Sequence, residues 1–228
     1  MSTPAAPSTA DRREMAEAVV AAAHALAGLG LVTAFGHVSQ RHHDQMLITP
    51  AIDLADATVH SLVEVPLDAD TLPPQAPGEA WIHLAVYRAR PDVGAVARAL
   101  PEAAFAVGAV ASRILPLHGQ GAFLGEAVPV HDDARLMRTA AIAQDAARTL
   151  ADADALVLRG NGAVAAASTP GRAVARMWLL DRTCRLYLAA RQAGTSKALT
   201  PGEVAAWRTA GEPLLERLWQ HLSRAGAP

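Results

Sequence analysis

Apolar and polar residues follow one another along this chain with two different periods, one helical and one extended. Met15, Val19, Ala22 and Leu26 recur every three or four residues, which places them on one face of a helix. Residues 62–67 alternate one by one, as in a strand with one buried face. The same patterns predict helices over about 11–28, 79–90, 101–110, 132–150, 169–192, 203–208 and 213–223, and strands near 38 and over 46–49, 62–67, 93–100, 114–117, 127–130, 155–158 and 163–167.

Residues with special backbone preferences support several of these boundaries. Pro170 suits the first position of the longest helix, and Asp132 or Asp133 suits the cap of the helix before it. Glycine and asparagine at 160–162 tolerate positive φ, so the two strands around them are expected to form a hairpin. A second hairpin turn is expected at 42–45.

Helices and strands are interspersed along the whole chain, without an internal repeat or a composition break. This order predicts a single α/β domain with three α/β/α layers and a mixed central β-sheet. The domain is expected over residues 10–224. Residues 1–9, rich in proline, alanine, serine and threonine, are expected to form a disordered tail.

The composition excludes several kinds of chemistry. The formal net charge of −2 indicates no nucleic-acid partner. Lys197 is the only lysine and falls in a polar linker, which argues against a Schiff-base aldolase because that mechanism needs a desolvated lysine. Cys184 is the only cysteine, so neither an internal disulfide nor a cysteine-cluster metal site is possible, and its helical position is typical of a small buried residue.

No apolar run approaches the roughly 18 residues of a membrane span, and no membrane partner is expected. The first ten residues lack a basic stretch followed by an apolar one, so they do not look like a secretory signal. These observations predict a cytoplasmic protein.

Four segments carry specific motifs. Residues 35–50 begin F-G-H-V-S-Q-R and end M-L-I-T-P, residues 79–96 read E-A-W-I-H-L-A-V-Y-R-A-R-P-D-V-G-A-V, residues 121–130 read G-A-F-L-G-E-A-V-P-V, and residues 155–173 contain L-R-G-N-G. In this order the segments resemble the class II aldolase/adducin family over about residues 30–200. The resemblance implies the three-layer fold and a cyclic homotetramer with sites between subunits. His37, where many aldolases of the family have asparagine, looks more like the family's decarboxylase-type branch.

The resemblance breaks down at the metal site. The family binds a divalent ion such as zinc through three histidines, two on a strand and one in a Leu-Arg-x-His-Gly turn. The matching positions here are Arg98, Leu100 and Asn161. A zinc site needs about three nitrogen, sulfur or carboxylate donors, whereas a guanidinium repels a cation and leucine donates nothing. We therefore expect no metal at this position and no other cofactor.

Two charged residues remain as candidates for the chemistry. Glu79 matches the family's general acid/base, although a carboxylate in the first turn of a helix is also favoured by the helix dipole. Arg98 is expected to project from the strand face that carries the ligands in the family. It is either paired with Glu79 as a structural plug or acts as a clamp for a substrate carboxylate or enolate. In both cases Arg98 and Glu79 should form an ion pair when the cleft is empty.

Further candidates for substrate binding are Ser39, His37, His83, His118 and Asn161. A lone histidine is more often a hydrogen-bonded structural residue, and this alternative stays open for each of them. So does a metal site relocated onto the histidines, to which His131 would also belong, although none of these residues has the spacing of a ligand pair. The pair at 42–43 is most simply a solvated turn.

Two functions are compatible with these residues. The first is a lyase without the usual metal, of the aldolase or decarboxylase type, which cleaves C–C or C–CO2 bonds of a small carboxylate or carbonyl substrate. The second is a non-catalytic family member that binds a small ligand or serves in assembly. A cleft in which Glu79, Arg98, His83 and His118 converge would favour the lyase. A cleft filled by side chains would favour the alternative.

Overall fold

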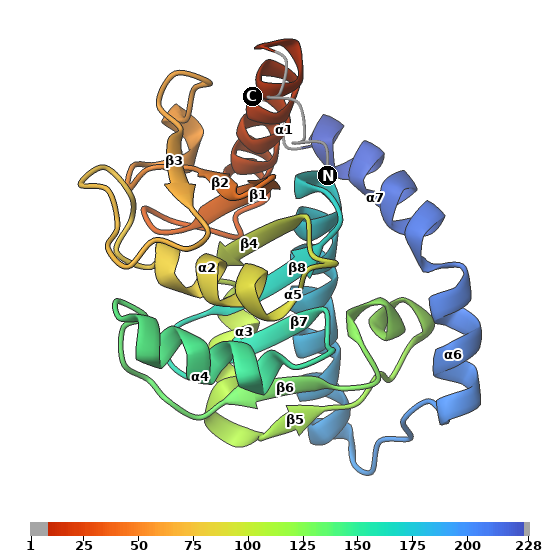
Figure 1. Cartoon of the computed structure of the whole chain (residues 1–228). Coiled ribbons are helices and arrows are strands. Elements are labelled where there is room, and N and C mark those ends of the chain that lie inside the picture. The colour runs from red at the N-terminus through yellow and green to blue at the C-terminus, as the bar shows by residue number, and fades with distance from the viewer. Residues whose placement is uncertain (1–8, 226–228) are drawn as a thin grey trace, which may run out of the picture.

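A mixed sheet of eight strands runs through the computed structural model, which describes residues 9–225. The strands lie in the order β3-β2-β1-β4-β8-β7-β6-β5 (Figure 1). Among the described pairs, β6 and β7 are parallel and the others are antiparallel. The strands are β1 (His37–His42), β2 (Gln45–Ile48), β3 (Val63–Pro66), β4 (Ala95–Ala99), β5 (Arg113–Ile114), β6 (Val128–His131), β7 (Ala155–Leu158) and β8 (Ala163–Ala167).

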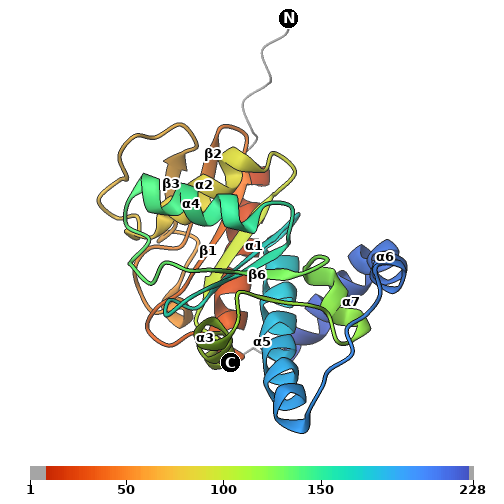
Figure 2. The same ribbon diagram turned by 90° about the horizontal axis from the view of Figure 1, so that it is seen from below.

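Helices cover both faces of this sheet (Figures 1 and 2). Helices α2 and α4 pack on one face, and α1, α3 and α5 pack on the other, with α7 outside α5. The predicted three-layer α/β/α fold with a mixed sheet is therefore confirmed. The helices are α1 (Thr9–Gly28), α2 (Ala80–Ala89), α3 (Glu102–Val110), α4 (Ala140–Leu150), α5 (Pro170–Ala193), α6 (Pro201–Thr209) and α7 (Gly211–Ala225), with short 3-10 turns η1 (Leu54–Asp56) and η2 (Gly119–Leu124).

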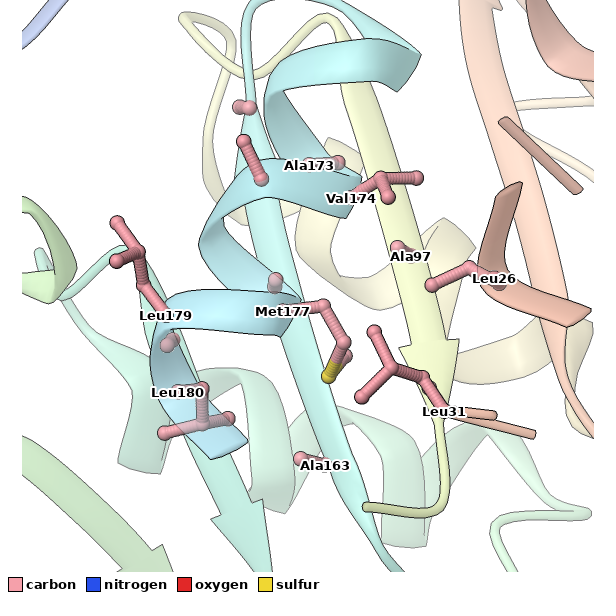
Figure 3. Packing of buried hydrophobic residues seen from close by; sticks show 14 of the residues in the cluster. Leu26, Leu31, Ala97, Ala163, Ala173, Val174, Met177, Leu179 and Leu180 are labelled. Carbon is pink, nitrogen blue, oxygen red and sulfur yellow. The ribbon is translucent and has the colours of Figure 1, made fainter. Parts of the chain in front are cut away.

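Small side chains line the centre of the sheet on the α5 side. In β4 and β8 these positions are held by alanines such as Ala97 and Ala163, both fully buried. Figure 3 shows Met177 of α5 pointing toward Leu31, and Val174 lying near Ala97 and Leu26. Because the alanines project so little, the helix can lie close to the strands.

The caps of the C-terminal helices follow from their sequences. Thr169 accepts a hydrogen bond from the backbone N–H of Arg172, and Pro170 occupies the first turn of α5, as predicted. At α6, Thr200 and Glu203 form a reciprocal capping box.

The β7–β8 hairpin, which was also predicted, brings a loop close to the end of β4. Gly162 has φ +78°, and a β-carbon there would lie 2.2 Å from the carbonyl oxygen of Ala99. Only glycine fits this approach. The turn therefore holds Asn161 beside the end of β4, which is the position that matters for the candidate site.

Two predicted elements were wrong in extent. The helix expected from residue 132 begins only at Ala140, after Thr139, because Asp133 accepts a hydrogen bond from the backbone N–H of Arg135 in a local turn. Leu136, in the segment before this helix, is 54% exposed. The strand expected over 114–117 is the short β5, and Leu115 beyond it is exposed.

Smaller differences concern the ends of the chain and of β4. The strand expected over 93–100 ends at Ala99, and the last two helices begin at Pro201 and Gly211, earlier than predicted. Residues 1–8 of the predicted tail lie outside the described residues, and Thr9 already belongs to α1. The domain limits otherwise stay a prediction.

Candidate active site

The candidate residues gather between α2 and the sheet, near the middle of the strand order. His37 and Arg98 are direct partners across β1 and β4, so their side chains stand next to each other on one face. Ser39, two residues along β1, lies on the same face. Helix α2 covers this face and places Glu79 at its N-terminus and His83 one turn later (Figure 1).

Glu79, Arg98 and Asn161 form a closed triangle of polar contacts. Arg98 Nη2 lies 3.1 Å from Glu79 Oε2 and donates to Asn161 Oδ1 at 2.5 Å. Asn161 Nδ2 donates to Glu79 Oε1 at 3.2 Å, which closes the triangle. The predicted ion pair between Arg98 and Glu79 is therefore confirmed. Since both partners are buried, the loss of either would leave an uncompensated charge.

The three positions that bind the metal in the family do not fit a divalent cation here. The Arg98 guanidinium occupies the place between Glu79 and Asn161, and the Asn161 amide oxygen already accepts from it. Leu100 lies past the end of β4 against Gly162 and has no donor atom. Over residues 9–225, no three His, Cys, Asp or Glu side chains form a group that could hold a metal. The relocated histidine site that the sequence left open is therefore not found.

A second polar group adjoins this triangle. The Ser39 hydroxyl lies 2.8 Å from His83 Nδ1 and 2.7 Å from the Tyr87 hydroxyl. These three residues are at most 1% exposed. His37 links the two groups, because its Nε2 is 4.0 Å from Glu79 Oε2 and its ring is 6.3 Å from the His83 ring.

Burial governs the protonation of the two histidines. It lowers the pKa of His37 to about 3, and the nearby Arg98 charge adds to the effect. Burial also lowers the pKa of His83 well below its usual value, with smaller contributions from His37 and Arg98. Both rings are therefore neutral at neutral pH, and Arg98 is the cation that faces Glu79.

Several buried nitrogen atoms of this site have no hydrogen-bond partner among the described residues. They are Arg98 Nε and Nη1, His83 Nε2 and His37 Nδ1. A buried N–H without an acceptor costs about 1–3 kcal/mol, more when it carries charge. Arg98 Nε and Nη1 are N–H donors in any case, so the site offers buried, unpartnered donors of a cation, which is the chemistry that receives an anion.

His118 does not join this group within one chain. It precedes η2, on the α5 side of the sheet, and its Nε2 lies 3.1 Å from Thr183 Oγ1 of α5. Of the four residues whose convergence would favour a lyase, His118 therefore lies apart from the other three in the single chain. His131 is also elsewhere, with its Nδ1 at 2.9 Å from Thr149 Oγ1 of α4.

Tyr87 was missed from the sequence as a polar member of the site. It follows His83 by four residues and so lies on the same face of α2. That spacing was the available signal, but an aromatic residue among Leu84, Val86 and Ala89 is more typical of an apolar core.

The cleft is almost filled in the single chain. The side chains of Glu79 and His37 are 11% and 9% exposed, and that of Arg98 is 3% exposed. A cleft filled by side chains is the result that, on the sequence alone, would favour a non-catalytic protein. The unpartnered donors point the other way, because a purely structural plug would satisfy them.

Comparison with known proteins gives the family context. The model of the class II aldolase and adducin N-terminal domain matches residues 17–188. A 3,4-dihydroxyphthalate decarboxylase from Terrabacter sp. (strain DBF63) is 29% identical and aligns with 81% of this chain and 84% of its own. A protein of the same name from Arthrobacter keyseri is 28% identical over 78% and 79% of the two chains. The crystal structure of L-fuculose-1-phosphate aldolase from Thermus thermophilus superposes with a TM-score of 0.73 and 29% identity, covering 83% of this chain and 100% of that one.

Proposed function

Because the chain belongs to the class II aldolase and adducin family, we propose that it is a lyase of the aldolase or decarboxylase type that works without the family's metal. Its substrate would be a small carboxylate or carbonyl compound. The observation that carries the proposal is the buried Arg98 guanidinium, 3.1 Å from Glu79, with unpartnered N–H groups at Nε and Nη1.

In this proposal Arg98 supplies the positive charge at the reacting centre. Its Nη2 is engaged by Glu79 and Asn161, while Nε and Nη1 remain to donate to a substrate oxygen. A fixed cation in a water-poor site stabilises the negative charge that develops on oxygen when the bond breaks. Arginine suits this role because it stays charged and donates in several directions.

Glu79 would move the proton. An anionic substrate competes with Glu79 for the guanidinium, and the displaced carboxylate can then take up and deliver a proton. In decarboxylation of a substrate with a carbonyl β to the carboxylate, or of an aromatic one in its keto form, the C–CO2 bond breaks and CO2 leaves. The electron pair forms an enolate whose oxygen Arg98 holds, and Glu79 passes to carbon a proton that it has taken up from solvent. In aldol cleavage Glu79 instead removes the hydroxyl proton as the C–C bond breaks.

Of the two reactions, decarboxylation is the better supported. The relatives from Terrabacter and Arthrobacter carry the name 3,4-dihydroxyphthalate decarboxylase and match most of this chain. A carboxylate leaving group also gives Arg98 an anion to bind before the reaction. We therefore place aromatic or enolisable carboxylates first among substrates.

The experiment assays chelator-treated protein for CO2 release from 3,4-dihydroxyphthalate and, in parallel, for cleavage of L-fuculose 1-phosphate. Arg98→Met and Glu79→Gln are each expected to lower kcat about 100-fold or more. Arg135→Met is the matched control, since Arg135 pairs with Asp133 at an exposed turn. Activity that depends on added Zn²⁺ would overturn the metal-free proposal.

A second candidate, a non-catalytic binding or assembly protein, is favoured by the near closure of the cleft. Arg98 is 3% exposed, and in the single chain its charge is already compensated by Glu79. If neither type of substrate is turned over and small carboxylates do not bind, this candidate replaces the lyase.

The family's proteins generally assemble into oligomers, and we propose a homotetramer for this chain. Large apolar side chains exposed in the single chain support an assembly, among them Phe35, Val110 and Leu136, at 65%, 59% and 54%. A monomer at micromolar concentration in analytical ultracentrifugation would contradict it.

A cytoplasmic location belongs to the same proposal. Over residues 9–225, no helix has the length and apolar character needed to cross a membrane. Fractionation of the native cells with an antibody against the chain would test the location.

A further inference from the structure

A short hydrogen-bonded chain ends at the anion-binding side of the site. It runs from the Tyr87 hydroxyl through Ser39 Oγ to His83 Nδ1, with distances of 2.7 and 2.8 Å. The other ring nitrogen, His83 Nε2, is fully buried and has no partner among the described residues. This series of hydrogen bonds therefore ends at an unpartnered atom, His83 Nε2, on the face of the sheet shared by His37 and Arg98.

The acceptors available to each hydroxyl hydrogen decide which residue donates in each of these hydrogen bonds. The acceptor within reach of the Tyr87 phenol hydrogen, among the described contacts, is Ser39 Oγ at 2.7 Å. The Ser39 hydrogen is then left for His83 Nδ1, which must be the acceptor. In the reverse direction the Tyr87 hydrogen would have no acceptor among the described contacts. The ring hydrogen of a neutral His83 is therefore on Nε2.

We propose that Tyr87 and Ser39 are positioning residues that hold His83 as a neutral Nε2–H donor, and that this donor binds the developing oxyanion of the substrate beside Arg98. The inference rests on the proposed lyase and extends it. It gives His83 a catalytic role and Ser39 and Tyr87 a role through His83, instead of direct contact with substrate.

A neutral imidazole is well suited to this place. Next to a guanidinium a second cation would be repelled, whereas an N–H dipole adds stabilisation without charge repulsion. Neutral histidine donors of this kind polarise carbonyl groups in other enzymes. The burial that lowers the pKa of His83 well below its usual value keeps the ring in this form at neutral pH.

The test reads the histidine directly. In ¹⁵N NMR of the whole protein at pH 7, His83 should show a proton on Nε2 and a hydrogen-bonded, unprotonated Nδ1. Titration with acetate, the carboxylate probe, should shift the Nε2–H signal. Ser39→Ala should give a mixed or reversed tautomer and weaken acetate binding about tenfold, the magnitude of one hydrogen bond.

Tyr87→Phe is the second variant, because it keeps the ring and removes only the hydroxyl, so it decides the matter if Ser39→Ala does not fold. It should shift the tautomer in the same direction. Thr183→Val is the matched control. It removes a hydroxyl 3.1 Å from another histidine, His118, and should leave the His83 signals unchanged.

A proton on Nδ1 in the wild type would overturn the inference, as would a tautomer that neither variant changes. A merely structural Ser39 would lower stability and leave the tautomer intact. Neither readout requires turnover, so failure of the proposed lyase, seen as no product, is distinguishable from failure of this chain of hydrogen bonds.

Discussion

Trp219 of α7 lies against Gly171 in the first turn of α5, so closely that a β-carbon at residue 171 would be 2.4 Å from the indole Nε1. The absence of a side chain at Gly171 therefore leaves the space that the indole ring occupies. Gly171→Ala should displace Trp219 and lower the free energy of unfolding by about 1–3 kcal/mol.

Gly202→Ala is the control for that variant, because Gly202 lies in α6 with no atom near its β-position. It should be neutral or stabilise by a few tenths of a kcal/mol to about 1 kcal/mol. Urea unfolding of both proteins provides the comparison. Equal effects would show that the close contact has no energetic consequence.

Metal content gives a second prediction. The wild type should carry no stoichiometric zinc at this site, and Arg98→His alone should not gain it, because Leu100 and Asn161 still provide no imidazole. The triple change Arg98→His, Leu100→His and Asn161→His should bind zinc. Elemental analysis after dialysis measures all three. About one Zn²⁺ per wild-type chain, with Arg98 lining the ion, would refute the prediction.

The third prediction concerns the ion pair between Arg98 and Glu79. Arg98→Met should cost about 3–5 kcal/mol of stability, since it leaves the Glu79 carboxylate buried without its cation. Adding Glu79→Gln should recover part of this loss, because the unpaired charge is then removed. Unfolding of the two single variants and the double variant gives the coupling energy. Simple additivity would mean that the two groups do not interact.

The fourth prediction concerns pH. The unfolded chain protonates its histidines near pH 6.5, whereas His37 in the folded protein has a pKa of about 3. Below pH 6.5 the unfolded state therefore binds the extra proton, and the free energy of unfolding falls as the pH falls toward 3. Each such histidine contributes about 1.4 kcal/mol per pH unit.

His83 acts in the same direction, since burial also lowers its pKa. His37→Asn should remove about 2 kcal/mol of the loss in stability between pH 6.5 and 5. Denaturant titrations at several pH values measure this slope. A slope that is unchanged in the variant would contradict the buried, neutral state of His37.

The sequence predicted the elements that have strong periodicity or clear caps, and it failed where local turns compete with a helix. Thr169 and Pro170 marked the start of α5 correctly. Asp133 looked like a helix cap, but its carboxylate bonds to the backbone of Arg135 and the chain stays irregular until Thr139. An aspartate that can cap or form a turn gives the same sequence signal in both cases.

The sequence likewise predicted some features of the candidate site and missed others. The pairing of Glu79 with Arg98 was predicted, because the resemblance aligned both residues with one cleft and a buried cation needs an anion. The position of His118 was not predicted, because a histidine in a glycine-rich connection can lie on either face of the sheet. Tyr87 was hidden because its hydroxyl function depends on Ser39, which is 48 residues away in sequence.

The alanine surface under α5 has a consequence for anyone redesigning this protein. Where strand side chains are methyl groups and the helix already lies against them, there is no spare volume, and a larger residue at Ala97 or Ala163 would lift the helix as a rigid body. Thr183 and Cys184 lie near the middle of α5, and Trp219 lies against its first turn. A change beneath the first half of α5 would therefore shift the helix together with the residues that pack on it, so libraries aimed at new substrates are better placed on the α2 side.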